Sequence, residues 1–322
     1  MYDVIIVGAG PAGLACAIEA RQSGLSHLVL EKGVLVNSIY NFPANMTFFT
    51  TANLLEIGDV PFLSAFEKPK RFEGLNYYRL VVQRLGLQVL DHFRVESIEG
   101  ESDNFRVSGH DRFGQSAAHR ARRIVVAVGY YDNPNFLGVP GEDLPTVHHY
   151  YTDPHPFFGK RVAVIGGKNS AAIAALELFR AGVQVALIYR GEQLHSHIKY
   201  WIMPDIKNRI AAGEVRAYFG TQVVEILSDR IRLRTGDGPV FELENDEVLA
   251  LTGYHPDVEL LRKWGLKVDP ETLVPDHDPA TLETTRPGVY LAGSIVSGRN
   301  TNKIFIENGR FHGRQIFAAL KK

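Results

Sequence analysis

The sequence predicts an α/β fold built from two similar domains, the second inserted into the first. Three observations carry this prediction. Two short β-branched runs each lead into a glycine-rich turn and then a helical stretch. Two later strands run into a glycine, as though the chain crossed between domains. The length of 322 residues agrees, because a typical domain has about 150 residues.

The first glycine-rich turn lies between a predicted strand and a predicted helix. Residues 3–7 read DVIIV, the turn 8–13 reads GAGPAG, and the helical stretch covers 14–22. The next predicted strand, residues 27–30, leads to Glu31, which lies 18 residues after the last glycine of the turn. This is the Rossmann-like dinucleotide-binding pattern, in which the acidic residue binds a ribose hydroxyl.

Each residue of this turn has an expected role. Gly8 permits the tight turn, Gly10 lets the backbone approach a pyrophosphate, and Gly13 lets the helix pack on the strand. Pro11 and Ala12 lie where the helix begins, and a helix N-terminus attracts phosphate.

A second turn of this kind begins near the middle of the chain. The predicted strand 161–165 leads into GGKNSA at 166–171, and a predicted helix follows at 172–180. Lys168 stands where the pattern has its middle glycine, and Ala171 takes the third position, where alanine is accepted. Because a lysine beside a pyrophosphate is electrostatically favourable, we expect a second dinucleotide site.

The end of the following strand indicates which nucleotide binds there. Residues 184–189 lead to Arg190, where a site for NAD would carry Asp or Glu. A cation at this position predicts the 2′-phosphate of NADPH, whereas the alternative is a solvated arginine at a strand end. His195 and Lys199 either add phosphate contacts or are surface residues. One acidic and one basic site predict FAD at the first turn and NADPH at the second.

Two segments indicate how the domains are connected. Residues 123–129 and 247–253 each read as a strand that ends in glycine, the first leaving the FAD domain and the second returning to it. We therefore expect an FAD-binding domain at 1–130 and 254–322, with an NADPH-binding domain at 131–253.

The C-terminal part predicts one more strand and one long helix. Residues 288–294 read as a strand that ends in small residues, and a helical stretch runs from about Lys303 to Leu320. The N-terminus of that helix is expected to face the flavin, where its partial positive charge would favour the reduced, anionic form.

Composition argues against several classes of partner and site. Lys and Arg total 35 against 36 Asp and Glu, without blocks of one sign, which argues against nucleic acid. The only cysteine, Cys16, cannot form an internal disulfide or a Cys-rich metal site and fits a reducing cytoplasm. We expect no signal peptide, membrane span or metal, because the N-terminal sequence lacks a basic region and apolar runs are short.

The order of these motifs resembles the two-domain flavoproteins that include the low-molecular-weight thioredoxin reductases. Within that group the whole chain resembles the bacillithiol-disulfide reductase (YpdA) family. The stretches that carry the resemblance are Lys32-Gly33, Asn37 to Asn41, Thr47 to Phe49, Leu55 to Asp59, Gly166 to Ala171 and Ile304 to Gly313. The resemblance implies an NADPH-dependent, FAD-containing enzyme that reduces a low-molecular-weight thiol disulfide, and it implies a homodimer.

Two departures limit what the resemblance implies. Thioredoxin reductases carry CxxC before the second dinucleotide strand, and residues 148–153 here read HHYYTD. The bacillithiol-reductase family has a cysteine in its first turn, GPCG, where this chain has Ala12. Cys16 lies one helical turn further on and is either a buried packing residue or a displaced redox thiol.

Motifs and resemblance together define two candidate sites. The candidate FAD residues are Gly8, Gly10, Pro11, Ala12, Gly13, Glu31, Lys32, Asn41, Thr47, Gly129, Gly293, Ser294, Lys303 and Ile304. The candidate NADPH residues are Gly166, Lys168, Asn169, Ser170, Ala171, Arg190 and Lys199. By analogy with thioredoxin reductases, Asn41 is expected to bind the flavin ring, and Tyr40, Phe48 and Phe49 either flank that ring or belong to the core.

Three functions remain open. The first is reduction of a small disulfide of the bacillithiol type, with electrons passing from the flavin without a protein cysteine. The second is reduction of ferredoxin or flavodoxin with NADPH, which requires only the flavin and a docking surface. The third is a non-enzymatic NADPH-binding redox sensor. No side chain is assigned as catalytic, because the flavin carries the chemistry.

Overall fold

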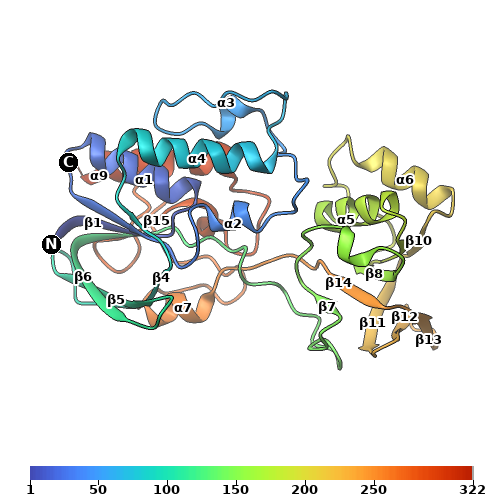
Figure 1. The fold of residues 1–322 in the computed structure, drawn as a ribbon. Helices are drawn as coiled ribbons and strands as arrows, with labels where there is room; N and C mark the ends of the chain where they lie inside the picture. The colour runs from blue at the N-terminus through green and yellow to red at the C-terminus, as the bar shows by residue number, and fades with distance from the viewer. Residues whose placement is uncertain (321–322) are drawn as a thin grey trace. The chain divides into compact units, whose positions relative to one another are not determined.

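The structure is a computed structural model that describes residues 1–320 and divides them into two compact units, unit 1 and unit 2 (Figure 1). Unit 1 combines Met1–Asn133 with the described chain from Tyr254 onwards, and unit 2 is Pro134–Gly253. Both units contain a largely parallel sheet with helices, so the α/β fold that the sequence predicts is confirmed. Residues 131–133, which were expected in the second domain, lie in unit 1.

Unit 1 contains a seven-stranded sheet in the order β3-β2-β1-β6-β5-β4, with β15 also paired to β6. Its strands are β1 (Tyr2–Val7), β2 (His27–Leu30), β3 (Val89–Leu90), β4 (Phe93–Glu99), β5 (Phe105–Asp111), β6 (Ser116–Val126) and β15 (Val289–Leu291). Its helices are α1 (Pro11–Gln22), α2 (Asn37–Tyr40), α3 (Ala52–Leu55), α4 (Arg71–Leu85), α7 (Val258–Lys263), the 3₁₀ helix η2 (Gly293–Ser297), α8 (Ile306–Gly309) and α9 (His312–Leu320).

The long strand β6 joins two kinds of pairing in this sheet. Its residues 116–121 pair antiparallel with β5, and its residues 121–126 pair parallel with β1. β15 and β2 extend the parallel part on either side. The carboxyl ends of β1, β6 and β15 therefore lie at one edge of the sheet.

Alternate residues of β1 belong to two different hydrophobic cores. Val4 and Ile6 pack with residues of α1, α4 and α9, which lie together on one side of the sheet (Figure 1). Ile5 and Val7 pack on the other side with residues of β4 and β5 and with the buried Trp264. A strand that is covered on both faces explains the continuous apolar run at the start of the sequence.

Unit 2 contains a parallel sheet in the order β10-β9-β8-β14-β7 and a separate antiparallel sheet in the order β11-β12-β13. Its strands are β7 (Val147–His148), β8 (Arg161–Ile165), β9 (Gln184–Ile188), β10 (Val215–Tyr218), β11 (Thr221–Ile226), β12 (Arg230–Thr235), β13 (Val240–Glu244) and β14 (Glu247–Ala250). Its helices are the 3₁₀ helix η1 (His155–Phe157), α5 (Asn169–Arg180) and α6 (Met203–Ala211).

The two faces of β8 are covered by different layers. Val162 and Val164 pack with residues of α5 and α6. Ala163 and Ile165 pack instead with the antiparallel sheet, including the buried Ile231 of β12. This alternation follows from the two-residue period of a strand.

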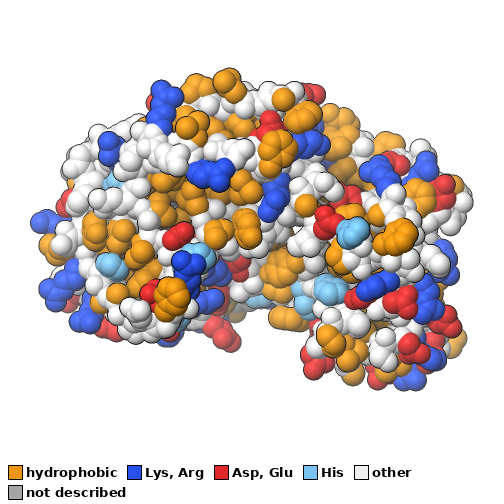
Figure 2. Space-filling view, viewed as in Figure 1, with side chains coloured by type: hydrophobic (Ala, Val, Ile, Leu, Met, Phe, Trp, Pro, Cys, Tyr) orange, Lys and Arg blue, Asp and Glu red, His pale blue; other side chains and the backbone are white. Residues whose placement is uncertain are grey.

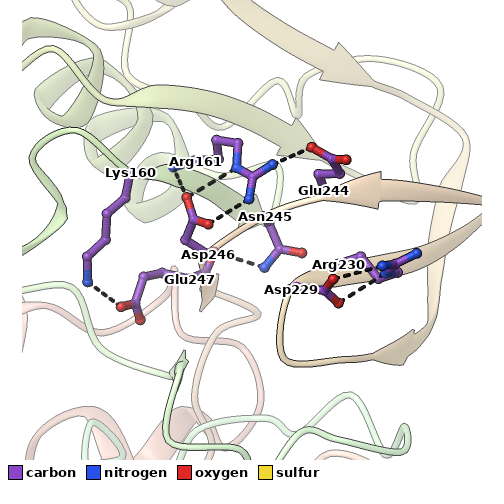
Figure 3. Close-up of polar contacts among 8 residues, drawn as sticks. All are labelled: Lys160, Arg161, Asp229, Arg230, Glu244, Asn245, Asp246 and Glu247. Carbon is purple, nitrogen blue, oxygen red and sulfur yellow. Dashed lines mark hydrogen bonds and ion pairs between the residues drawn. The ribbon is translucent and has the colours of Figure 1, made fainter.

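Ion pairs fasten the amino ends of β8 and β14 (Figure 3). The Asp246 carboxylate accepts hydrogen bonds from the backbone N–H and from Nη2 of Arg161, both at 2.7 Å, and these contacts lower the pKa of Asp246. Arg161 also pairs with Glu244, and Nζ of Lys160 lies 2.5 Å from the Glu247 carboxylate. The opposite, carboxyl edge of this sheet carries the second glycine-rich turn.

The predicted helix at 303–320 is wrong, because the chain forms α8 and α9 with a break between them. Just before the break, a Cβ atom at Gly309 would lie 3.4 Å from Cα of Gly293. The Arg310 side chain at the break donates to the carbonyl oxygens of Asn53 and Glu56, at 2.9 and 2.7 Å. These contacts tie the break to Gly293 and to the C-terminal end of α3.

On the face drawn in Figure 2, acidic and basic side chains are interspersed over each unit. Within residues 1–320, no helix is long and apolar enough to cross a membrane. In the same part of the chain, no group of three or more His, Cys, Asp and Glu side chains is placed to hold a metal ion.

Candidate functional site

Three segments of the candidate FAD site meet at the carboxyl edge of the unit 1 sheet. The last residues of β1, β6 and β15 pair in register, so the segments 8–13, 127–129 and 292–294 start side by side. In open α/β sheets, ligands bind outside the carboxyl ends of the strands, where the strand order reverses. The sequence alone predicted these three segments, and the topology brings them together.

Two glycines of the first turn are required by the backbone around them. Gly8 has a φ of +110°, and a Cβ atom there would lie 2.5 Å from the carbonyl oxygen of Ala127. A Cβ atom at Gly13 would lie 2.0 Å from the carbonyl oxygen of Gly8. Any side chain at either position would force α1 and β6 away from β1, so both residues determine how the layers pack.

Gly10 differs, because no protein atom lies within 4 Å of a Cβ atom built there. Its φ of −70° is also open to any residue. Neither conformation nor packing therefore requires glycine at this position. The open space lies beside the N-terminus of α1, where Pro11 occupies a first-turn position that needs no N–H donor. A bare backbone at this place fits the close approach of a pyrophosphate.

Glu31 is buried and fastens the turn to the end of β2. Its Oε2 accepts the backbone N–H of Ala9 at 2.8 Å, and its Oε1 accepts the N–H of Gly33 at 2.9 Å. Burial raises the pKa of Glu31, and the two hydrogen bonds oppose that shift. A carboxylate held in this way presents its remaining lone pairs to ribose hydroxyls, so the residues fit the adenosine part of FAD.

Glu31→Ala should lower FAD affinity and also the free energy of unfolding of the protein without FAD, the latter by about 2 kcal/mol, because one buried and one partly buried N–H donor lose their acceptor. Glu31→Gln should have an FAD affinity and a free energy of unfolding between those of the unmodified protein and those of Glu31→Ala, since its amide keeps one carbonyl acceptor. Fluorescence titration with FAD and urea unfolding measure both effects, with the exposed Glu101→Ala as the matched control. Normal FAD binding by Glu31→Ala would remove the residue from the site.

Asn41 makes protein contacts that the sequence did not predict. Its Nδ2 donates to the carbonyl oxygen of Asn37 at 3.0 Å, and its own carbonyl oxygen accepts the Tyr131 hydroxyl at 3.2 Å. The Tyr131 ring packs against the rings of Phe42 and Tyr254, with centroids 4.9 and 4.7 Å away. Sequence reasoning missed Tyr131, although two consecutive tyrosines after a glycine were a usable signal.

Lys32 and Thr47 each have a partner within unit 1. Nζ of Lys32 lies 2.8 Å from the carboxylate of Asp132. The Thr47 hydroxyl accepts a hydrogen bond from Nζ of Lys70 at 2.7 Å. Both side chains therefore tie loops near the turn to other parts of unit 1, and their contact with FAD stays a prediction.

The aromatic residues after α2 have different environments. Phe48 is buried in the core against α4, where a Cβ atom at Gly74 would lie 2.7 Å from its ring. Tyr40 is half exposed, and the Arg71 guanidinium lies 5.6 Å from the centre of its ring. The sequence left open whether these aromatic residues flank the flavin ring or belong to the core. The structure places Phe48 in the core.

The segment 292–294 packs directly on the first turn. A Cβ atom at Gly293 would lie 2.8 Å from Cβ of Ala12, and one at Gly129 would lie 3.5 Å from Oγ of Ser294. Four candidate FAD residues thus gather at one place. Lys303 and Ile304 precede α8, so neither belongs to a helix, and the expected long helix N-terminus at the flavin is absent from the described residues.

His312, which the sequence did not single out, supports this segment. Its Nδ1 lies 3.0 Å from the backbone nitrogen of Gly293 and accepts that N–H, so the ring is neutral with its proton on Nε2. Burial, together with the nearby His277, lowers the pKa of His312 to about 4. At neutral pH this histidine is a fixed hydrogen-bond acceptor.

Because the folded protein resists protonation of His312, acid should destabilise it. Below pH 6.5, the ordinary value, the unfolded chain binds a proton that the folded chain rejects, so the free energy of unfolding falls as pH drops from about 6.5 to about 4. His312→Ala should be less stable at pH 7 and should lose less on acidification. Urea unfolding at pH 7 and pH 5 tests this, and equal losses in both proteins would refute it.

Cys16 is fully buried where α1 crosses α9. A Cβ atom at Gly313 of α9 would lie 2.9 Å from Cα of Cys16, so the two helices touch backbone to backbone. Burial, and next the charge of Glu19, raises the pKa of the thiol far above its ordinary value. A buried and protonated thiol is a poor nucleophile, which supports the packing interpretation.

Cys16→Ser should lower the free energy of unfolding by about 1–3 kcal/mol, because it buries a hydroxyl in an apolar contact. Reduction of the flavin by NADPH should stay unchanged, and so should turnover of the acceptor. Urea unfolding and stopped-flow absorbance measure these quantities, with Cys16→Ala as the comparison. Normal flavin reduction with lost acceptor turnover would instead identify a redox thiol.

The second turn repeats this geometry with Lys168 in place of the middle glycine and Ala171 in place of the third. Gly166 has a φ of +146°, and a Cβ atom there would lie 2.6 Å from the carbonyl oxygen of Leu251 and 2.9 Å from Cβ of Ala171. Lys168, in the place of the middle glycine, has extended backbone with a φ of −114°. Since any residue adopts this conformation, the lysine is tolerated, and it stands at the N-terminus of α5.

The other candidate NADPH residues lie around this turn in unit 2. Arg190 is exposed just beyond the end of β9, whose last residue pairs with that of β8. Asn169 and Ser170 are the first residues of α5. The Tyr189 ring, which sequence reasoning missed, lies 2.4 Å from where a Cβ atom of Gly167 would be, so a side chain at residue 167 would displace this ring.

Comparisons with known proteins agree with this geometry. The family described as "Pyridine nucleotide-disulphide oxidoreductase" matches residues 5–293. The chain is 44% identical over 318 residues to bacilliredoxin reductase Bdr of Bacillus subtilis (strain 168), covering 99% of this chain and 97% of that protein. A solved structure of bacillithiol disulfide reductase Bdr (YpdA) from Bacillus cereus has a TM-score of 0.96 at 44% identity, covering 99% and 98%. A ferredoxin–NADP reductase of Ignicoccus hospitalis is 26% identical over 334 residues, covering 100% and 99%.

These matches establish the class of the enzyme. A family model that spans most of the chain makes the protein an NADPH-dependent flavoprotein oxidoreductase with FAD as its second cofactor. The first turn, together with the Glu31 carboxylate that is hydrogen-bonded to it, fits FAD. The second turn fits a pyridine nucleotide. The chain belongs to the bacillithiol disulfide reductase (Bdr, YpdA) family of pyridine nucleotide-disulphide oxidoreductases.

Proposed function

We propose that the protein uses NADPH to reduce a low-molecular-weight thiol disulfide of the bacillithiol type, without a redox-active cysteine of its own. The similarity to bacillithiol disulfide reductases supports the substrate class, and the buried position of Cys16, the only cysteine of the chain, between α1 and α9 supports a reaction without a protein thiol. FAD would bind at the turn 8–13 of unit 1 and NADPH at the turn 166–171 of unit 2.

The residues divide the work between binding and orientation. Gly10 and the N-terminus of α1 would hold the pyrophosphate of FAD, and Glu31 would hold its ribose. Lys168 and Arg190 would hold the phosphates of NADPH. Bound FAD would accept a hydride from NADPH and pass two electrons to the S–S bond, which breaks into two thiols after taking up two protons.

A thiol relay within the protein has no place in this reaction. Residues 148–153 contain no cysteine, and residue 12 is alanine. Ala12 packs against Gly293, where an added Cβ atom would lie 2.8 Å from Cβ of Ala12, so neither residue carries a group that could relay electrons. A small disulfide would therefore have to reach the flavin itself, which a low-molecular-weight substrate can do more easily than a protein disulfide.

A panel of acceptors tests the proposal. Purified holoprotein and NADPH are offered bacillithiol disulfide, glutathione disulfide, flavodoxin and ferredoxin at matched concentrations, and NADPH oxidation is followed under anaerobic conditions. We expect the highest kcat/KM with bacillithiol disulfide, and we expect Cys16→Ser to retain it. Preference for flavodoxin or ferredoxin would contradict the proposal.

A second candidate function is reduction of ferredoxin or flavodoxin. The similarity over the full length to a ferredoxin–NADP reductase favours it, and so does the absence of a cysteine at residue 12. The same panel separates the two functions. Tight NADPH binding with negligible turnover of every acceptor would instead indicate a redox sensor. We further propose a homodimer in the cytoplasm, which light scattering and cell fractionation test.

Arg190→Ala should reduce the preference for NADPH over NADH about tenfold or more, because a charge-assisted contact with the 2′-phosphate is lost. The ratio of the two kcat/KM values measures the effect, and the exposed Arg216→Ala of β10 serves as the control. If the ratio stayed the same in Arg190→Ala, the residue would not contact the 2′-phosphate.

A further inference from the structure

We propose that Asn169 is a positioning residue that holds the segment 195–199 against the second glycine-rich turn. We further propose that the preference for NADPH over NADH depends on this segment being held in place by Asn169. The inference rests on the proposed NADPH site and deepens it. The sequence places Asn169 among the residues that contact the nucleotide. Its side chain instead makes two hydrogen bonds to another part of unit 2.

Both ends of the Asn169 amide are used. Its Nδ2 donates to the carbonyl oxygen of His197 at 3.1 Å. Its Oδ1 accepts the backbone N–H of Lys199 at 2.9 Å. Two peptide groups, two residues apart, are thus held by one side chain. Among short side chains, only an amide offers a donor and an acceptor at this separation.

A second contact ties the same segment to the turn. The backbone N–H of His195 donates to the carbonyl oxygen of Gly167 at 3.1 Å, and the N–H of His197 donates to Nδ1 of His195 at 3.1 Å. Ile198, between these residues, is buried in the core under α5. The segment 195–199, called the bracket below, is therefore held by the buried Ile198 on its core side and by the hydrogen bonds of Asn169 on its other side.

Cationic and ionisable residues lie in the bracket and in the turn that it contacts. Lys199 belongs to it, and Lys168 stands in the turn itself. His195 lies close enough to Lys168 that, after burial, the charge of Lys168 and then that of His197 lower the pKa of His195. Arg190 follows β9 at the same edge of the sheet. Groups from two segments can act on one 2′-phosphate only if the bracket keeps its position.

Loss of the Asn169 side chain should act on the phosphate preference more than on the turn. The turn keeps its own constraints, because Gly166 and Gly167 are enclosed by Leu251 and Tyr189. Without the Asn169 side chain, the carbonyl oxygen of His197 and the N–H of Lys199 form hydrogen bonds with water instead. The bracket can then move away from the nucleotide. The binding energy that the 2′-phosphate adds would then fall.

The test compares two nucleotide fragments that differ by the 2′-phosphate, 2′,5′-ADP and 5′-AMP, with holoprotein in calorimetric titrations. Asn169→Ala should weaken 2′,5′-ADP about tenfold and 5′-AMP by less than about threefold. Its KM for NADPH should rise while kcat at saturation stays the same. Hydrogen exchange should be faster at residues 194–203. Asn169→Ser, whose hydroxyl replaces at most one of the two bonds, should be intermediate and keeps the test open if the alanine variant does not fold.

The control is Asn208→Ala, an exposed amide on α6, which should leave both fragments unaffected. Equal weakening of both fragments by Asn169→Ala, or unchanged hydrogen exchange in the bracket, would overturn the inference while leaving the NADPH site in place. If the unmodified protein did not prefer 2′,5′-ADP to 5′-AMP, the proposed NADPH site would itself be wrong, and the inference would fall with it.

Discussion

The contact of backbone with backbone inside the first turn is the constraint on which the rest of unit 1 depends. A Cβ atom at Gly13 would lie 2.0 Å from the carbonyl oxygen of Gly8, so α1 can lie on β1 only if neither residue has a side chain. This placement sets Gly10 at the open edge of the sheet. It also places Cys16 against Gly313 of α9, where the thiol is fully buried. One close contact thus positions both the candidate cofactor site and the buried Cys16.

Local patterns predicted the features that depend on neighbours in sequence. Both strand–turn–helix units and the convergence of their strands follow from hydrophobic runs and glycine spacing. The break near Arg310 did not, because it depends on contacts with Asn53 and Gly293, which are distant in sequence. For the same reason the acceptor role of His312 and the two backbone bonds of Asn169 were not predictable. The identity of a side chain alone does not predict which distant peptide group the side chain will form a hydrogen bond with.

The two turns show which positions of the dinucleotide pattern have structural reasons and which have chemical ones. Gly8 and Gly166 both adopt a positive φ and press against a neighbouring strand end, so both are glycine. The middle position is extended in both turns, and it carries Gly10 in one and Lys168 in the other. Because the backbone permits either residue, the choice there reflects the ligand. A bare backbone suits close approach of a pyrophosphate, and a lysine suits added negative charge.

With Cys16 buried and no other cysteine in the chain, the proposed function makes the flavin the only two-electron store of each protein chain. The most direct test is an anaerobic titration of holoprotein with dithionite, followed by flavin absorbance, with free thiols counted under denaturing conditions before and after. We expect an endpoint of about two electrons per FAD and an unchanged thiol count. An endpoint near four electrons, or a thiol that appears on reduction, would contradict this account.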